Sequence, residues 1–205
     1  MQIELESKFS SILNSKKRNA NLRGNSLIIS PQLSDYLKEF NLPLYFSEKD
    51  PGVEPAESYG AGYSISVFNF ANSYIAKAAG VEVLCPLKLP AYLVYIDENS
   101  DLPAGESLLF SLGITVPEDF RAALKLSFKF NAVLRSFFER RGSDLVSIKV
   151  KFVISNDKVL INGDLTYSDL LLLPPESNRD LLKYVTAPDE KNTKKHIKFI
   201  NKVLE

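Results

Sequence analysis

The chain has 205 residues, 45% of them hydrophobic and 11% aromatic, which is enough apolar material for one large domain or two small lobes. Its 25 basic and 25 acidic residues balance, which argues against a nucleic-acid partner, because such partners normally select a basic excess. The single cysteine, Cys85, excludes an internal disulfide and a cysteine-based zinc site. No apolar run of about 20 residues is present to cross a membrane. With an N-terminus unlike a signal peptide, these features predict a soluble cytoplasmic protein.

The first quarter of the chain predicts short elements followed by a long loop. An amphipathic helix is expected over residues 4–15, and a short strand over 26–29. Ser30 and Pro31 suit the N-cap and first position of a second helix. Residues 46–62 contain two prolines and three glycines, so we expect a surface loop that marks a lobe boundary.

The middle of the chain is expected to alternate helices with short strands. A helix is predicted over 63–79 and is closed by Gly80, because glycine readily adopts the left-handed conformation that ends helices. Strands are predicted over 81–85 and 91–96. A long helix should follow over 116–140.

The C-terminal part predicts a hairpin and a basic helix. The long helix should end at Gly142, and two strands should then turn at Asn156-Asp157. A basic amphipathic helix is expected over 190–204. It contains His196, the single histidine, which we expect at the surface, so catalysis by histidine is not expected. Helices mixed with antiparallel strands indicate an α+β fold.

The first strand of the hairpin carries Lys149 and Lys151, and two aspartates follow its partner strand. Side chains alternate along a strand, so both lysines should lie on one face, opposite an apolar face. Asp164 follows at the end of the second strand and Asp169 comes five residues later. Two interpretations remain open at this point: an ordinary solvated sheet face, or the floor of a phosphate or metal site.

Two stretches resemble the SAICAR synthetases, purine-biosynthesis ligases that join aspartate to a carboxyaminoimidazole ribonucleotide. The stretch "GAGYSISVFNFANSYIAKAAGV" is similar to the family's Gly-Lys-Gly, helix and closing glycine, with Gly60, Gly62 and Gly80 in place. Downstream, "LVSIKVKFV" and "GDLTYSD" resemble the family's Leu-Val-Asp-Phe-Lys-Leu-Glu-Phe and Ala-Asp-Glu-Ile-Ser-Pro-Asp segments. The resemblance covers residues 60–173 and predicts a divergent and shortened member of the family.

The resemblance implies a fold and a site. The fold would be α+β, with antiparallel sheets and flanking helices forming two lobes around a cleft. Residues 1–59 would form a divergent N-terminal lobe, and 60–205 the main lobe or, with it, a single compact unit. ATP and Mg²⁺ are the implied cofactors, and a small-molecule nucleotide the implied ligand; a homo-oligomer is left open. The implied residues divide into catalytic (Lys149, Asp169), nucleotide- or substrate-binding (Gly60, Gly62, Lys149, Lys151) and metal-binding (Asp164, Asp169).

Several polar positions of the family carry other residues in this chain. These are Ala61, Ile65, Tyr92, Ile96, Lys151, Leu165 and Leu172. At Lys151 an ammonium stands in place of a glutamate, which changes the local charge by about two units and would repel Mg²⁺. Lys151 would then pair with Asp164 or contact an anionic ligand directly.

The sequence therefore leaves three hypotheses. The first is an ATP-dependent ligase that forms an amide between a carboxylated ribonucleotide and an amino acid such as aspartate. The second is a catalytically degenerate relative that serves as a nucleotide-binding, protein-binding or regulatory subunit. The third is a chance resemblance in an ordinary α+β domain.

Overall fold

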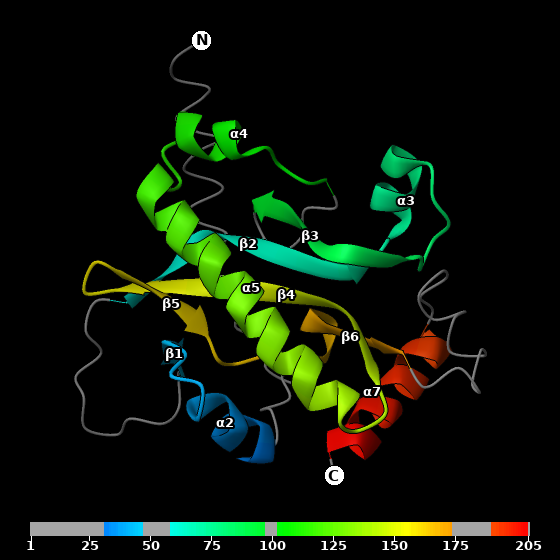
Figure 1. Cartoon of the computed structure of the whole chain (residues 1–205). Coiled ribbons are helices and arrows are strands. Elements are labelled where there is room, and N and C mark those ends of the chain that lie inside the picture. Colours follow the sequence, from blue (N-terminus) through cyan, green and yellow to red (C-terminus); the bar gives the residue numbers. More distant parts are fainter. Residues whose placement is uncertain (1–30, 47–57, 97–101, 174–189, 205) are drawn as a thin grey trace.

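The structure is a computed structural model of the 205-residue chain, and it describes residues 31–46, 58–96, 102–173 and 190–204. These residues form a mixed six-stranded sheet with flanking helices (Figure 1). The predicted α+β class is confirmed. The predicted division between residues 59 and 60 stays a prediction.

The sheet has the strand order β1-β5-β4-β2-β3, and β6 pairs with the end of β4. β1 and β5 are parallel, and the other paired strands are antiparallel. The strands are β1 (Leu44–Tyr45), β2 (Ser58–Phe70), β3 (Pro86–Ile96), β4 (Asp144–Ser155), β5 (Lys158–Asn162) and β6 (Leu170–Leu173). The helices are α2 (Pro31–Lys38), α3 (Ser73–Ala79), α4 (Glu106–Ser111), α5 (Pro117–Glu139), the 3-10 helix η3 (Tyr167–Asp169) and α7 (Glu190–Leu204).

Helix α5 lies across one face of the sheet and supplies much of the core (Figure 1). Pro117 occupies its first turn together with two acidic residues, which suits the helix dipole, and the chain turns at Gly142 with φ 67°. The prediction of a long helix over 116–140 is thus confirmed. Its fully buried aromatic residues are Phe120, Phe130, Phe137 and Phe138.

Two buried asparagines join α5 to the sheet. Asn69 of β2 and Asn131 of α5 each donate a side-chain N–H to the other's Oδ1 at 2.9 Å. Asn69 Nδ2 also donates to the Leu145 carbonyl of β4 at 2.9 Å. Because buried amides must be hydrogen-bonded, this pair fixes the register of the helix on two strands.

The predicted helix over 63–79 is wrong in its first half, where the chain forms β2. Ile65 and Val67 are fully buried against the core, while Ser64 and Ser66 lie on the opposite face. That alternation has the period of a strand. The helical part is α3 alone, in which the Asn72 side chain accepts a hydrogen bond from the Ile75 N–H at 2.8 Å.

Other sequence predictions have mixed outcomes. Residues 81–85 form a turn, not the predicted strand, and Leu84 has φ 65°. The predicted loop over 46–62 is wrong for 58–62, which belong to β2, while 47–57 lie outside the described residues. The strand predicted over 91–96 is confirmed and begins earlier, at Pro86.

The remaining elements of the C-terminal half follow the prediction. The hairpin turns at Asn156 and Asp157, whose φ angles of 49° and 57° suit a tight two-residue turn between twisted strands. The helix predicted to begin at Pro31, in the N-terminal quarter, is α2, and the helix predicted over 190–204 is α7. The predicted helix over 4–15 and strand over 26–29 lie outside the described residues.

His196 is buried, so the prediction of a surface position is wrong. It lies on the inner side of α7, and its Nε2 accepts a hydrogen bond from the Leu172 N–H of β6 at 3.3 Å. Burial disfavours the imidazolium and lowers the pKa of His196 from 6.5 to about 4. A neutral imidazole thus attaches α7 to the edge of the sheet.

Among the described residues, no helix combines the length and the apolar character needed to cross a lipid bilayer.

Replacing Asn131 with alanine should lower the free energy of unfolding by about 2 kcal/mol, because Asn69 would lose its buried partner. Urea denaturation followed by circular dichroism measures the change. Lys129→Ala, on the exposed side of the same helix, should shift it by about 0.5 kcal/mol or less. Equal losses in the two variants would contradict a stabilising role for the asparagine pair.

Folding stability should fall between pH 6.5 and about pH 4 through His196. The folded-state pKa is lower than the unfolded one, so the unfolded chain binds the proton more readily and stability is lost as pH falls. The loss should reach about 3 kcal/mol at most. Urea titrations at pH 7.5 and pH 5 measure it, and His196→Gln should show a weaker pH dependence. Parallel pH profiles for both proteins would refute the assignment.

Candidate functional site

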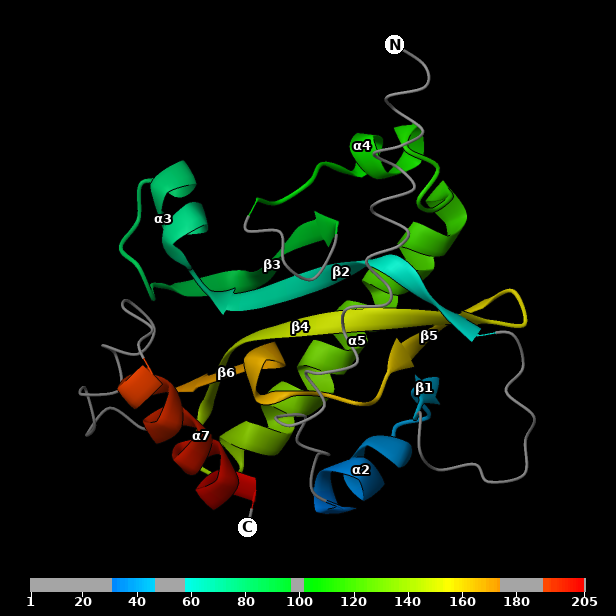
Figure 2. The same cartoon turned by 180° about the vertical axis from the view of Figure 1, so that it is seen from behind.

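The face of the sheet opposite α5 carries a patch of polar and aromatic side chains. Figure 2 shows β2, β3 and β4 from this side, with α5 behind them. Ser64 and Ser66 of β2 pair with Lys151 and Lys149 of β4, and Ser64 also pairs with Tyr95 of β3. Cross-strand partners share one face of a sheet, so these five residues lie together. We call them the polar face.

The short serines leave room for longer neighbours to reach over β2. Lys149 Nζ lies 5.7 Å from the centroid of the Tyr95 ring, although these residues are on strands separated by β2. A cation over an aromatic face is attracted by the ring quadrupole. The alignment of both lysines on one face, as predicted, is thus present in the strand register.

Lys151 forms an ion pair with Asp169. Lys151 Nζ lies 3.3 Å from Asp169 Oδ1, and the two side chains are 20% and 1% exposed. Asp169 Oδ2 accepts hydrogen bonds from the Thr166 N–H at 2.8 Å and from Thr166 Oγ1 at 2.7 Å. These bonds form the capping box of η3, in which Thr166, three residues before Asp169, holds the carboxylate in place.

Two buried polar atoms of this site make no hydrogen bond within the part of the chain that the structure describes. They are Ser64 Oγ and Asp169 Oδ1, the latter keeping its ionic contact with Lys151. A buried polar atom without a hydrogen bond costs free energy. Both atoms belong to the surroundings of Lys151, and a hydrogen-bonding group beside it would offset that cost.

The side chains around Lys151 do not fit Mg²⁺. Magnesium requires near-octahedral oxygen coordination, usually with one or two carboxylates. One carboxylate oxygen of Asp169 accepts hydrogen bonds from Thr166, and the other contacts the Lys151 ammonium. The described ranges contain no group of three or more His, Cys, Asp and Glu residues placed to hold a metal ion.

Asp164 lies just beyond β5, in a connection that leads to η3. Its N–H donates to Asn162 Oδ1 at 2.9 Å, which tightens the chain there. The preceding residue, Gly163, passes so close to Phe46 that an added Cβ would lie 2.4 Å from the ring. The structure therefore fixes the backbone of Asp164, and the predicted metal role of this residue stays a prediction.

Gly60 and Gly62 do not lie before a helix. Both are within β2, at a shift in its register against β4 between Gly60 and Ser64. Gly62 has φ 78°, a conformation that glycine adopts without strain. The helix that the resemblance implies after these glycines is absent, because both lie within β2, and their predicted binding role stays a prediction.

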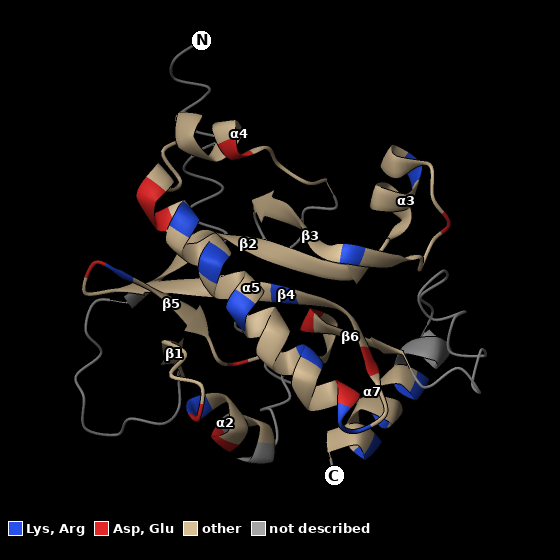
Figure 3. Cartoon of the chain, in the orientation of Figure 1, with Lys and Arg blue, Asp and Glu red and all other residues tan. Residues whose placement is uncertain are grey.

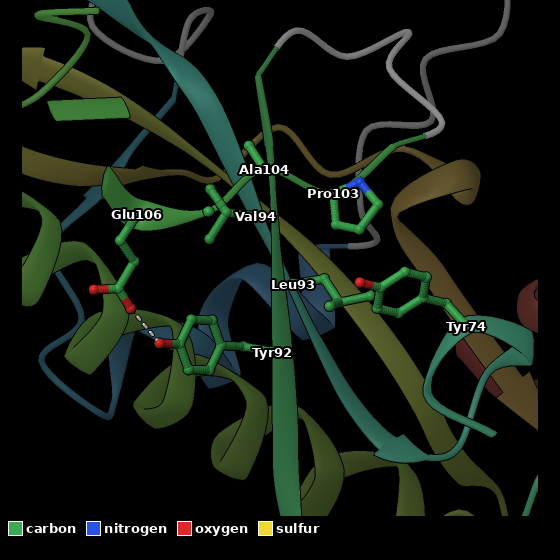
Figure 4. A pocket seen from close by; sticks show the side chains of 8 residues that line it. Tyr74, Tyr92, Leu93, Val94, Pro103, Ala104 and Glu106 are labelled. Carbon is green, nitrogen blue, oxygen red and sulfur yellow. Dashed lines mark hydrogen bonds between the residues drawn. The ribbon is translucent and has the colours of Figure 1, made fainter. Parts of the chain in front are cut away.

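Most positions that differ from the family pattern are apolar side chains in or against the core. Ala61, Ile65, Leu165 and Leu172 are buried, and Ile96 packs against the core. Tyr92 instead donates its hydroxyl to Glu106, which raises the pKa of Tyr92 to about 12. This pair borders an open hollow of about 330 Å³ beside β3 (Figure 4).

Several basic residues also occur along α5 (Figure 3). The exposed residues there are Arg121, Lys125, Lys129 and Arg135. Arg121 lies 3.8 Å from Glu118, and Arg135 lies 2.6 Å from Glu139. Such spacing on one helix is ordinary surface charge, so this stripe is not a second candidate site.

Three members of the polar face were missed by the sequence interpretation. Ser64 and Ser66 fall in the predicted helix over 63–79, and Tyr95 falls in the predicted strand over 91–96 without a predicted role in the site. The alternation of polar and apolar residues in "SISV" is the signal that could have placed both serines on one face of a strand. The contact between Lys149 and Tyr95 depends on strand pairing, which no local pattern reveals.

The chain resembles curated SAICAR synthetases in sequence. A phosphoribosylaminoimidazole-succinocarboxamide synthase from Psychrobacter sp. is 29% identical over 119 residues, which are 57% of this chain and 50% of the relative. The enzyme of that name from Clostridium kluyveri is 24% identical over 177 residues, 81% of this chain and 72% of the relative. The chain spans about half the length of the first of these relatives. No protein-family model matches the chain.

Solved SAICAR synthetases are similar to the chain in fold. The protein from Pyrococcus horikoshii OT3 has a TM-score of 0.68 and 20% identity, over 84% of this chain and 80% of that one. The protein from Ehrlichia chaffeensis has a TM-score of 0.66 and 17% identity, over 84% and 76%. A further SAICAR synthetase, solved in complex with ADP, has a TM-score of 0.64 and 18% identity, over 84% and 78%. The predicted resemblance and the predicted fold are both confirmed.

Replacing Asp169 with alanine should destabilise the protein by about 2 kcal/mol or more. The change removes the capping box and leaves the Lys151 ammonium without its carboxylate. Chemical denaturation measures the loss, and Asp144→Ala, which removes an exposed carboxylate from β4, is the matched control. An unchanged midpoint for Asp169→Ala would show that the ion pair contributes nothing to folding.

Proposed function

We propose that this chain, which has the fold of the SAICAR synthetases, is an ATP-dependent ligase of their type. It would form an amide between a carboxylated ribonucleotide and an amino acid such as aspartate. Sequence similarity to SAICAR synthetases and the likeness to one solved with ADP support this proposal. Within the molecule, the observation that carries it is the polar face, where Lys151 pairs with Ser64, whose hydroxyl is buried, and Lys149 pairs with Ser66.

The chemistry of amide formation assigns distinct tasks to the polar face. ATP would transfer its terminal phosphoryl group to the substrate carboxylate, and the amine would then attack the acyl phosphate and release phosphate. Such a transfer is accelerated by positioning and by positive charge near the phosphate oxygens. Lys149 would supply that charge. Asp169 would act as a positioning residue that holds Lys151 through their ion pair.

A second candidate function is favoured by one observation. Thr166 donates two hydrogen bonds to one oxygen of the Asp169 carboxylate and the Lys151 ammonium contacts the other, which argues against the metal role predicted for Asp169. A relative that binds a nucleotide without catalysis, as a regulatory subunit, would need only the lysines and Ser64. The binding role of Gly60 and Gly62 stays a prediction without support from a helix N-terminus. Cytoplasmic location, oligomeric state and amino-acid substrate also stay predictions.

Lys149→Met should weaken ATP binding about tenfold, because it removes one charge that would face the phosphates. Isothermal titration calorimetry with ATP, ADP and AMP measures the affinity. The matched control is Lys158→Met, which removes an exposed lysine at the hairpin turn. Equal affinities in the two variants would remove Lys149 from the site.

A coupled assay of ADP release, with carboxylated ribonucleotide and aspartate present, then separates the two candidate functions. Turnover that requires both substrates supports the ligase. ATP binding without turnover supports the second candidate. A well-folded protein that binds no nucleotide would refute both functions.

A further inference from the structure

We propose that this chain binds the phosphate groups of its nucleotide without a divalent cation, and that Lys151 supplies the positive charge in place of the metal. The inference rests on the proposed nucleotide-binding function. It concerns how the polar face compensates the negative charge of a phosphate chain. Four features of the described residues lead to it.

The first feature is the occupation of the buried carboxylate. Asp169 Oδ2 accepts two hydrogen bonds from Thr166, at 2.8 and 2.7 Å, and Oδ1 lies 3.3 Å from Lys151 Nζ. A metal ion could take Oδ1 only by displacing the ammonium, and the displaced charge would then lie beside a divalent cation. Like charges at such short range repel, so the pair excludes Mg²⁺ from this carboxylate.

The second feature is the fixed position of the Lys151 charge. The Asp169 side chain is 1% exposed and is held by the capping box of η3, so it gives the ammonium a rigid anchor. The Lys151 side chain remains 20% exposed, and a solute can therefore reach part of it. An anchored ammonium needs little reorganisation when an anion arrives, which is the advantage that a bound metal ion normally provides.

The third feature is a hydroxyl donor without an acceptor. Ser64 is 2% exposed and pairs with Lys151 across β2 and β4, and its Oγ has no hydrogen-bond partner within the described part of the chain. A hydroxyl carries one O–H donor, and a phosphate oxygen is a strong acceptor. An anion beside Lys151 would satisfy the hydroxyl and the ammonium together.

The fourth feature is the net charge of the polar face. Lys149 and Lys151 both bring a positive charge to the polar face, and the Asp169 carboxylate paired with Lys151 offsets one of the two charges. A lysine is a compact point charge that suits phosphate recognition. The polar face therefore attracts an anion before any metal binds, whereas it repels a free divalent cation.

The decisive experiment compares ATP binding to the full-length chain in EDTA and in millimolar Mg²⁺, by isothermal titration calorimetry. We expect the dissociation constant to change by less than about threefold between the two buffers. Binding that requires Mg²⁺ would overturn this inference and leave nucleotide binding intact. No binding in either buffer would overturn both, so the two failures are distinguishable.

Charge variants at Lys151 test the residue itself. Lys151→Gln should weaken binding in EDTA about tenfold, and Lys151→Arg should keep it within about threefold of the parent protein. Lys158→Gln, which removes an exposed lysine at the hairpin turn, is the matched control and should bind like the parent. Parent-like binding by a folded Lys151→Gln variant would overturn the assignment.

Reversing the charge makes the test sharper. Lys151→Glu should abolish binding in EDTA and recover it at least in part with Mg²⁺, because the new carboxylate and Asp169 would then offer oxygen ligands to the metal. Circular dichroism checks that the variant folds, and if it does not, the glutamine and arginine variants decide. Binding in EDTA by a folded Lys151→Glu variant would refute the proposal.

Discussion

The structure depends on the burial of one face of the sheet beneath α5. Every second residue of β2 and β4 enters that contact, and Ile65, Val67, Ile148 and Val150 are fully buried in it. The intervening residues are then forced onto the other face, because strand side chains alternate. The polar face is the complement of the core: a one-residue slip of β4 would exchange its lysines with core residues. Near the C-terminal end of β2, Asn69 opposes such a slip, because it is hydrogen-bonded both to Asn131 of α5 and to the Leu145 carbonyl of β4.

Because the core fixes the strands, the site needs few dedicated interactions. Ser64, Ser66, Lys149 and Lys151 are placed by the register of two strands, and one ion pair adds Asp169 from η3. The family resemblance concerns this same arrangement of strand and connection. Where the chain departs from the family pattern, the replacements are mostly apolar and join the core, but Lys151 introduces a charge. The Ser64 hydroxyl beside that charge is buried and makes no hydrogen bond within the described part of the chain.

Much of this arrangement could be predicted from local patterns, and the failures have physical causes. The long helix α5, the hairpin at Asn156-Asp157 and the alignment of the lysines follow from periodicity and turn chemistry, which act over a few residues. The stretch after Gly62 is a strand and not the predicted helix: its polar and apolar residues alternate only over 64–67, and pairing with two neighbouring strands extends the strand to Phe70. Neither the partner of Lys151 nor the burial of His196 could be predicted, since both depend on contacts between segments distant in sequence.

The approach of Gly163 to the Phe46 ring has a mechanical consequence. The ring fills the space that any larger side chain at position 163 would need, and the Gly163 N–H donates to the Tyr45 carbonyl at 2.7 Å. Phe46, which follows β1, and Gly163, which precedes Asp164, are therefore held against each other. Any displacement of the Gly163 backbone would therefore press on the Phe46 ring. The NMR chemical shifts of that ring would report movement of the connection between β5 and η3.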